Sequence, residues 1–402
     1  MVKVLMFGWE YPPHNSGGLG IACQGLTRGL RGHGTDIIFV LPKKVDVSEE
    51  LIKFVYGDEA SSTKTSHYII NSTLKPYVDS QSYINSMSSQ NAGGGMYGNT
   101  LIEEVNRYGE LAREVAKQED FDVIHAHDWL TMKAGIAAKE VSKKPLIVHI
   151  HATEFDRTGG NNNQMIYDIE REGIQAADIV VTVSQWTKDK VVEHYGADPN
   201  KVRVVHNALN FENYTIENVY RMKKDNKKIV LFVGRITIQK GPDYFVDAAK
   251  KVIEKEPDAV FVFAGSGDME RQMIEKAASL GIGDKVLFAG FLRGDDLVEA
   301  FKMADVFVMP SVSEPFGLVP LESMSCGTPA IISHQSGVSE IISHCLKIDF
   351  WDVDDMASKI VSVLHYSALR EELAKNGIEE VKGITWDKPA QKCIDIYNEL
   401  SS

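Results

Sequence analysis

Residues 305–322 read DVFVMPSVSEPFGLVPLE, and this stretch decides the fold class. Its first part, 305–311, is a short apolar and β-branched run, which is typical of a strand buried on both faces. The proline and glycine that follow interrupt a continuous helix, whereas Pro320 is tolerated in a first helical turn. The stretch therefore predicts a strand, then a loop with Glu314, then a helix whose first turn carries Glu322.

The same alternation of apolar runs and helical patterns extends along the first half of the chain. Strands that alternate with helices predict βαβ units and a parallel sheet. The expected strands are VKVLMFG (2–8), DIIFVLP (36–42), DVIHAH (122–127), PLIVHIHA (145–152), DIVVTVS (178–184) and VRVVHNA (202–208). The expected helices cover residues 19–32, 100–118, 129–141, 161–176 and 185–195.

The second half repeats the pattern, which predicts a second α/β sheet. Strands are expected at 227–234, 259–267, 285–291, 305–311 and 329–333, helices at 243–256 and 297–304, and helical structure throughout 356–401. A chain of 402 residues also exceeds the usual size of a single domain. We therefore expect two Rossmann-like, doubly wound domains, at 1–210 and 211–384, with a C-terminal helix at 385–402 that packs back on the first domain.

Two segments depart from this rhythm. Residues 211–228 are polar and offer few core candidates, so we expect the join between the domains near them. Residues 58–100 are rich in Ser, Asn and Gly, which predicts a long irregular loop. Such a loop is either a mobile surface segment or a lid that contributes to an acceptor site.

Composition narrows the classes of function. A net charge of −13 argues against nucleic acid as a partner and against anchoring on an anionic membrane. No apolar run approaches the roughly 20 residues that span a bilayer. The first residues, MVKVLMFGWEYPP, lack the pattern of a signal peptide, so we expect a cytoplasmic protein. Four widely spaced cysteines without a CxxC pair indicate free thiols.

Candidate ligand-binding residues follow the predicted strands, because parallel α/β sheets bind ligands at the carboxyl ends of their strands. Gly17 and Gly18 lie between the first strand and a helix, where glycine lets backbone N–H groups approach a phosphate. Arg235 and Lys240 follow the first strand of the second half, in GRITIQKGPD. Two cations beside a helix N-terminus suit a diphosphate, although a solvated basic loop explains the same residues.

The loop in the opening stretch predicts a third element of this site. A helix that begins near Gly317 or Leu318 directs the backbone N–H groups of residues 317–319 toward an anion. Glu314 before the helix and Glu322 inside it then flank the bound group and accept hydrogen bonds from hydroxyls. The alternative is an exposed Glu314 and a Glu322 that only stabilises the helix dipole.

Histidines end two predicted strands of the first half, in HAHDW (125–129) and HIHATEFDRTGG (149–160). Alternation along a strand sends His149 and His151 to the same face, so His127, Asp128 and His151 are candidate cleft residues. These residue types also bind metals, but no spacing among them is diagnostic of a metal site.

Taken together, these segments resemble retaining glycosyltransferases of family 4, which have the GT-B fold. EPFGLVPLE looks like the E-x7-E motif of the family, GRITIQKG like its G-R-x4-K-G segment and HNSGGLG like its glycine-rich N-terminal loop. The family's typical sequences are also similar to three further segments, ADIVVTVS, HNALN and ADVFVMPSVSEPFG. The resemblance therefore covers nearly the whole chain.

The resemblance implies roles for the matching residues. Arg235 and Lys240 would bind the donor diphosphate, Glu322 the ribose hydroxyls and Glu314 the hydroxyls of the donor sugar. His151 would lie beside the sugar at the reaction centre, so the catalytic candidates are His151, Arg235, Lys240 and Glu314. The other donor-binding candidates are Gly17, Gly18, Asp128, Phe316, Gly317 and Leu318, of which Asp128 follows from a resemblance of HAHDW to glycogen and starch synthases.

The implied function is transfer of a hexosyl unit, with glucose preferred, from a nucleotide-diphosphate sugar to a saccharide acceptor, as in glycogen synthase. UDP- or ADP-glucose is the expected co-substrate, with retention of configuration and neither a metal nor a resident cofactor. Two alternatives on the same plan are a nucleotide-sugar 2-epimerase and a transferase for a lipid or cell-surface glycan. A dehydrogenase is disfavoured because NSGGLG breaks the GxGxxG fingerprint. A glycosidase with Glu314 and Glu322 as its acid pair, and a sugar-binding protein without catalysis, stay open.

Overall fold

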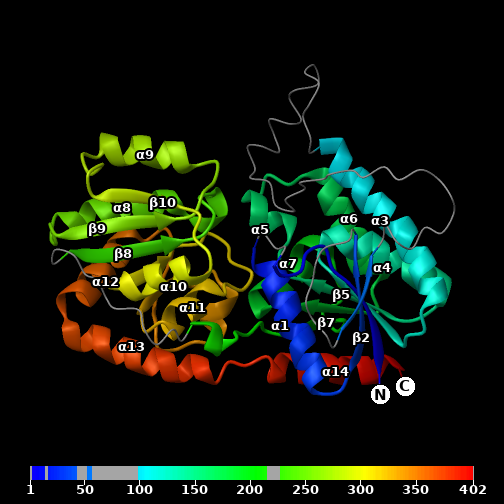
Figure 1. Cartoon of the computed structure of the whole chain (residues 1–402). Coiled ribbons are helices and arrows are strands. Elements are labelled where there is room, and N and C mark those ends of the chain that lie inside the picture. Colours follow the sequence, from blue (N-terminus) through cyan, green and yellow to red (C-terminus); the bar gives the residue numbers. More distant parts are fainter. Residues whose placement is uncertain (1, 14–16, 43–51, 57–97, 215–226, 402) are drawn as a thin grey trace. The chain divides into compact units, whose positions relative to one another are not determined.

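The computed structural model describes residues 2–13, 17–42, 52–56, 98–214 and 227–401. These residues form two compact units (Figure 1). The first unit comprises Met1–Phe155, Asn161–Ala208 and Trp386–Ser402, and the second comprises Asp156–Gly160 and Leu209–Thr385. The predicted irregular loop at 58–100 lies almost entirely outside the described residues.

The first unit contains a seven-stranded parallel sheet with the order β3-β2-β1-β4-β5-β6-β7. Its strands are β1 (Lys3–Phe7), β2 (Asp36–Leu41), β3 (Lys53–Tyr56), β4 (Val123–His127), β5 (Leu146–Ile150), β6 (Ile179–Thr182) and β7 (Val202–Val204). Strands β4 and β5 are buried along their whole length, including the histidines that interrupt their apolar runs. Its helices are α1 (Gly18–Gly32), α3 (Gly98–Gln118), α4 (Trp129–Ser142), α5 (Glu154–Thr158), α6 (Gln164–Ala176), α7 (Gln185–Tyr195) and α14 (Asp387–Ser401), although α5 runs across a boundary between the units.

The second unit contains a six-stranded parallel sheet with the order β10-β9-β8-β11-β12-β13. Its strands are β8 (Lys228–Val233), β9 (Ala259–Ala264), β10 (Val286–Gly290), β11 (Val306–Met309), β12 (Ala330–Ser333) and β13 (Leu346–Ile348). Its α-helices are α8 (Pro242–Ile253), α9 (Glu270–Ser279), α10 (Gly294–Met303), α11 (Val319–Ser325), α12 (Val353–His365) and α13 (Ser367–Lys382). Three short 3-10 helices complete it, namely η1 (Phe211–Tyr214), η2 (Ile238–Lys240) and η3 (Gly337–Glu340). The predicted class of two doubly wound parallel sheets is confirmed.

The last helix of the chain packs within the first unit. Figure 1 shows α14, in red, beside α1, in blue. A Cβ atom on Gly25 of α1 would lie 2.1 Å from the Trp386 ring, and one on Gly29 would lie 2.8 Å from the Trp386 carbonyl oxygen. Glycine at these two positions therefore allows the chain to approach α1 closely at Trp386, just before α14 begins.

The main segment of the second unit, Leu209–Thr385, begins and ends at one place. The backbone N–H of its first residue, Leu209, donates to the carbonyl oxygen of its penultimate residue, Ile384, at 3.3 Å. Among the described residues, no helix combines the length and the hydrophobicity that crossing a bilayer requires.

Candidate functional site

Each sheet has one position where the strand order reverses, and the candidate residues lie at these two positions. In the first sheet the reversal falls between β1 and β4, and in the second between β8 and β11. The crevice beyond the carboxyl ends of such a strand pair is where open α/β sheets bind ligands. Gly17 and Asp128 follow β1 and β4, while Arg235 and Glu314 follow β8 and β11.

In the second unit, the loop after β8 presents Arg235 and Lys240. Lys240 is the last residue of η2, and the chain then turns at Gly241, which has φ +63°. A Cβ atom on Gly241 would lie 2.2 Å from the Pro310 carbonyl oxygen. Pro242 starts α8 at a position where proline costs no hydrogen bond. Glycine at 241 thus lets Lys240 lie close to the end of β11.

An ion pair joins the two loops of this crevice. Lys240 Nζ contacts Glu314 Oε2, and the Ser311 hydroxyl donates to the same carboxylate oxygen at 3.1 Å. The side chains of Lys240 and Glu314 are only 17% and 9% exposed. The structure therefore brings together two of the predicted catalytic residues, which lie 74 positions apart in the chain.

The segment that carries Glu314 is fixed by backbone hydrogen bonds. The Glu314 N–H donates to the Gln335 carbonyl at 2.9 Å, and the Gly337 N–H donates to the Glu314 carbonyl at 3.0 Å. The Val338 N–H donates to the Phe316 carbonyl at 2.7 Å. Residues 314–316 therefore form a short strand-like edge that holds the Glu314 carboxylate in place.

Gln239 is a residue of this site that the sequence analysis missed. Its side-chain oxygen accepts a hydrogen bond from Arg235 Nη2 at 3.1 Å. Its side-chain nitrogen donates to the Ser313 carbonyl at 3.1 Å, and its own carbonyl accepts from the Val312 N–H at 2.9 Å. Gln239 therefore orients Arg235 and ties the β8 loop to the β11 loop. A glutamine between two predicted cations gave no signal of this role.

The predicted helix after Glu314 begins one or two residues later than expected. Helix α11 starts at Val319, with Leu318 as its N-cap, after a turn at Gly317 with φ +96°. It has seven residues, and Phe316 and Leu318 are buried beside it. Glu322 lies in its first turn, as the sequence predicts, and its side chain is buried.

Glu322 has a partner that the sequence did not reveal. The Tyr214 hydroxyl of η1 donates to Glu322 Oε1 at 2.8 Å. Burial raises the pKa of the Glu322 carboxyl, whereas the hydrogen bond from Tyr214 lowers it. Glu322 is therefore neither exposed nor unpaired, and the alternative of a mere dipole-stabilising residue does not explain its burial.

In the first unit, four histidine rings stack at the ends of β4 and β5. The ring centroids are 4.4 Å apart for His125 and His127, and also for His149 and His151. His125 Nδ1 lies 2.7 Å from the Tyr397 hydroxyl and its Nε2 lies 3.2 Å from His149 Nδ1. Desolvation lowers the pKa of each ring, to about 3 for His125, so these imidazoles are neutral at pH 7.

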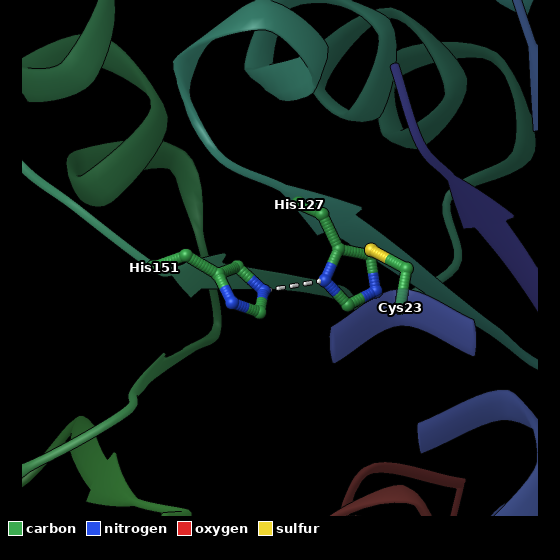
Figure 2. Close-up of side chains that lie close together, drawn as sticks. All are labelled: Cys23, His127 and His151. Carbon is green, nitrogen blue, oxygen red and sulfur yellow. Dashed lines mark hydrogen bonds between the residues drawn. The ribbon is translucent and has the colours of Figure 1, made fainter. Parts of the chain in front are cut away.

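His151 stands at the outer end of this stack. Its Nε2 lies 3.0 Å from His127 Nδ1, and the Cys23 side chain of α1 lies beside the same pair (Figure 2). His125, His127 and His149 are buried, whereas His151 is partly exposed. Of the four rings, His151 is thus the one that can meet a ligand without rearrangement.

Asp128 shapes the backbone around His151. The residue has φ +60°, a conformation that is uncommon for an amino acid other than glycine. Its Oδ1 accepts hydrogen bonds from the backbone N–H groups of His151 at 2.6 Å and Ala152 at 3.3 Å. The predicted role of Asp128 near a sugar stays a prediction, but the described contacts show that it holds the His151 loop.

The glycine loop of the first unit is described from Gly17 onward. Gly17 is the N-cap of α1 and Gly18 its first residue. The Glu10 carboxylate accepts a hydrogen bond from the Gly20 N–H at 3.0 Å. This bond fixes the start of α1 to the segment that follows β1. A Cβ atom on Gly17 would meet no atom of the described residues within 4 Å, so these neighbours do not require glycine there.

Comparison with known proteins identifies the family. The family model for Glycosyltransferase Family 4 matches residues 99–213, and that for Glycosyl transferases group 1 matches residues 218–380. An uncharacterized glycosyltransferase of Methanocaldococcus jannaschii is 32% identical over 418 aligned residues, which cover 98% of each chain. The chain belongs to glycosyltransferase family 4. A glycogen synthase of Mycobacterium tuberculosis is 25% identical to this glycosyltransferase over 98% of its length and 94% of the relative.

Solved structures agree on the fold of this glycosyltransferase. Sucrose-phosphate synthase from Thermosynechococcus elongatus superposes with a TM-score of 0.77 at 21% identity, over 100% of this chain and 99% of that one. HepE of Anabaena, solved with UDP and glucose, gives a TM-score of 0.72 at 16% identity over the full length of both chains. The predicted GT-B fold is confirmed.

Proposed function

We propose that this glycosyltransferase moves a glucosyl unit from a nucleoside-diphosphate glucose to a saccharide acceptor, with retention of configuration. The observation that carries the proposal is the ion pair of Lys240 with Glu314 at the β8–β11 crevice. Arg235 lies on the same loop as Lys240, and Glu322 is buried in the helix that follows Glu314. Support for the donor class comes from HepE, whose structure contains UDP and glucose. Support for a saccharide acceptor comes from the similarity to a glycogen synthase along nearly the whole chain.

The chemical problem in this reaction is departure of the nucleotide. As the bond from sugar to phosphate breaks, negative charge develops on the diphosphate and positive character on the sugar ring. Arg235 and Lys240 supply fixed positive charge for the diphosphate, and groups held in place before the reaction need no solvent reorganisation. Gln239 keeps the Arg235 guanidinium oriented.

The carboxylates have separate tasks in the proposed mechanism. Glu322, buried at the start of α11, accepts hydrogen bonds from the ribose hydroxyls. Glu314 accepts hydrogen bonds from the donor sugar on the other side of the diphosphate, with Lys240 shared between the carboxylate and the phosphate. His151 contacts the sugar from the first unit, with Asp128 holding its backbone.

We assign retention of the anomeric configuration to attack by the acceptor hydroxyl on the face of the sugar from which the nucleotide departs. In this mechanism the departing phosphate oxygen takes the proton of the acceptor hydroxyl, and no covalent intermediate with the protein forms. The cations are protein side chains, so the reaction is proposed to need neither a metal nor a resident cofactor. Gly17, the N-cap of α1, is proposed to leave room for the donor close to the backbone, because a Cβ atom there would meet no described atom within 4 Å. Gly18, the first residue of α1, is assigned to the same contact.

A two-stage experiment tests the proposal. Calorimetric titration with UDP-, ADP- and GDP-glucose identifies the donor, and we expect UDP- or ADP-glucose to bind most tightly. The protein is then incubated with the donor so identified and with glycogen or maltooligosaccharides, and the anomeric configuration of the product is measured by NMR. An α-glucoside supports the proposal. A changed free nucleotide sugar identifies a 2-epimerase, and cleavage of a glycoside without nucleotide identifies a glycosidase.

A further inference from the structure

Three potential metal ligands lie close together in the first unit. Cys23, His127 and His151 each offer one ligand atom, and these three atoms lie within 4.8 Å of one another (Figure 2). Zinc binds thiolate and imidazole at about 2.0–2.3 Å, which places neighbouring ligand atoms of a tetrahedral site roughly 3.3–3.8 Å apart. Small movements of the side chains are therefore enough to bring all three around one ion.

His127 contains a nitrogen that lacks a partner in the described part of the chain. Its Nδ1 faces His151, whereas its Nε2 is buried and has no hydrogen-bond partner among the described residues. Nε2 lies on the far side of the ring from His151, so an ion shared by His127 and His151 binds His127 through Nδ1 and replaces the present hydrogen bond between the two rings. The lone pair of Nδ1 is available for the ion when the proton of the neutral imidazole is on Nε2.

The surroundings of Cys23 favour a cation. Glu10 and Asp128 are both buried near the thiol. The negative charges of these two carboxylates attract a divalent cation, which displaces the thiol proton when it binds. A zinc–thiolate unit therefore fits these buried, acidic surroundings.

A neighbouring set of ligands is less suitable. His125, His127 and His149 also lie within reach of one ion, but all three are buried. His125 already has the Tyr397 hydroxyl on one nitrogen and His149 on the other. The set with Cys23 includes sulfur, which zinc binds well, and includes the partly exposed His151 as a route of entry.

We propose that Cys23, His127 and His151 form a Zn²⁺ site whose occupation inhibits the transferase. The ion is not part of the transfer reaction, which is proposed above to proceed without metal. Instead it engages His151, so that this ring no longer contacts the donor sugar. The inhibitory effect rests on the proposed function, because it requires His151 to face that sugar, whereas the binding of zinc does not.

Binding is tested without any substrate. Chelator-treated protein is titrated with Co²⁺, whose bond to a thiolate gives a charge-transfer band in the near ultraviolet, and zinc should then displace the cobalt. We expect the band in the wild type and in the Cys345→Ala control, which removes a buried thiol of the second unit. The band should be absent in Cys23→Ala and in His127→Ala. Retention of the band in Cys23→Ala, or its absence from the wild type, overturns the site.

A second measurement protects the test from a variant that fails to fold. X-ray absorption at the zinc edge of the loaded wild type should show one sulfur and two nitrogen ligands from the protein. A shell of nitrogen alone overturns the assignment and indicates the three buried histidines. Equal circular dichroism and melting temperature qualify each variant before its spectrum is interpreted.

Inhibition is measured separately, with each variant compared to its own rate in the absence of zinc. The zinc concentration for half inhibition should rise by at least about tenfold in Cys23→Ala and stay unchanged in Cys345→Ala, with full recovery on adding EDTA. Equal inhibition of both variants overturns the inhibitory role. A protein that shows the cobalt band but transfers no sugar contradicts the proposed function and still supports the metal site.

Discussion

Lys240 Nζ contacts Glu314 Oε2 across the crevice between the loops that follow β8 and β11, and both side chains are largely buried. The two residues come from the separate motifs GRITIQKG and EPFGLVPLE. Their contact means that the cation proposed for the diphosphate and the carboxylate proposed for the sugar are one electrostatic unit. A change at either residue must therefore affect both stability and donor binding.

Lys240→Met should lower the free energy of unfolding by about 3–5 kcal/mol, because it leaves the Glu314 carboxylate buried and unpaired. The double variant Lys240→Met/Glu314→Gln should lose clearly less, since it removes the uncompensated charge. Urea unfolding measures both. Lys250→Met is the control, because the pair of Lys250 with Glu254 is exposed and should contribute less than about 1 kcal/mol. Equal losses in the single and double variants would contradict this account.

Arg235→Ala should reduce turnover by roughly a hundredfold or more, because one preorganised donor to a developing anion contributes on the order of 3 kcal/mol. Its unfolding free energy should change little, since Arg235 is partly exposed. The assay is steady-state transfer with the donor identified by titration. Arg271→Ala provides the control, because Arg271 is exposed on α9 and pairs with Glu275 in its own helix. Wild-type turnover in Arg235→Ala would rule out the assigned role.

Tyr214→Phe should shift the pH dependence of nucleotide binding upward. Burial already raises the pKa of Glu322, and the Tyr214 hydrogen bond opposes that rise, so its loss raises the pKa further. Only the ionised carboxylate accepts hydrogen bonds from both ribose hydroxyls, so affinity grows as the pH rises through this pKa. Calorimetric titration with UDP between pH 4 and 8 should give an acid limb at higher pH in Tyr214→Phe than in the wild type.

Glu322→Gln checks the origin of that limb, because it should bind UDP weakly and without the acid limb. The contribution of Glu322 to folding stability depends on pH in the opposite direction to its contribution to UDP binding. A carboxyl whose pKa is raised on folding stabilises the folded state at low pH, and this contribution is lost as the pH rises through the folded pKa. Identical pH profiles for the wild type and Tyr214→Phe would exclude the influence of Tyr214 on Glu322.

Gly241→Ala should destabilise the protein more than Gly281→Ala. Both glycines have φ values near +65°, namely +63° and +69°, so both substitutions place alanine in a strained conformation. Only at Gly241 would the new Cβ lie 2.2 Å from a backbone oxygen, that of Pro310, whereas Gly281 has open space. Gly281→Ala should cost about 1–2 kcal/mol and Gly241→Ala clearly more. Similar losses in thermal unfolding would show that the approach of these loops is not tight.

The sequence predicted the repeated sheets well because their central strands are short, mainly apolar and β-branched runs. DVIHAH (122–127) and PLIVHIHA (145–152) correspond to β4 and β5, which are buried on both faces. The edge strands β3 and β13 were not predicted, since KFVY and LKI are short and lack such a run. Helix α6 begins at Gln164, later than the predicted residue 161, because the Asn163 side chain caps it.

For the candidate site, the sequence pointed to residues that belong to motifs, whose roles stay predictions, and it did not reveal residues that are placed by tertiary contacts. Arg235, Lys240, Glu314 and Glu322 follow from two motifs and from the position of strand ends. Tyr214 and Gln239 could not be found this way, because each acts through one side chain placed by the fold beside a distant partner. Alternation along β4 and β5 likewise does not show that the histidines at the ends of these strands form a single stack. Two buried nitrogens of this stack, His127 Nε2 and His149 Nε2, have no hydrogen-bond partner among the described residues.

The hydrogen bond between Leu209 and Ile384 has a consequence for engineering. Because the main segment of the second unit, Leu209–Thr385, begins and ends beside this hydrogen bond, it has the topology of an insertion in a first unit that is completed by α14, with only Asp156–Gly160 contributed from elsewhere in the chain. This segment can be exchanged for that of another family member by cutting the backbone at two points, near Leu209 and near Ile384, which lie side by side. Such an exchange tests whether nucleotide preference is determined by this segment.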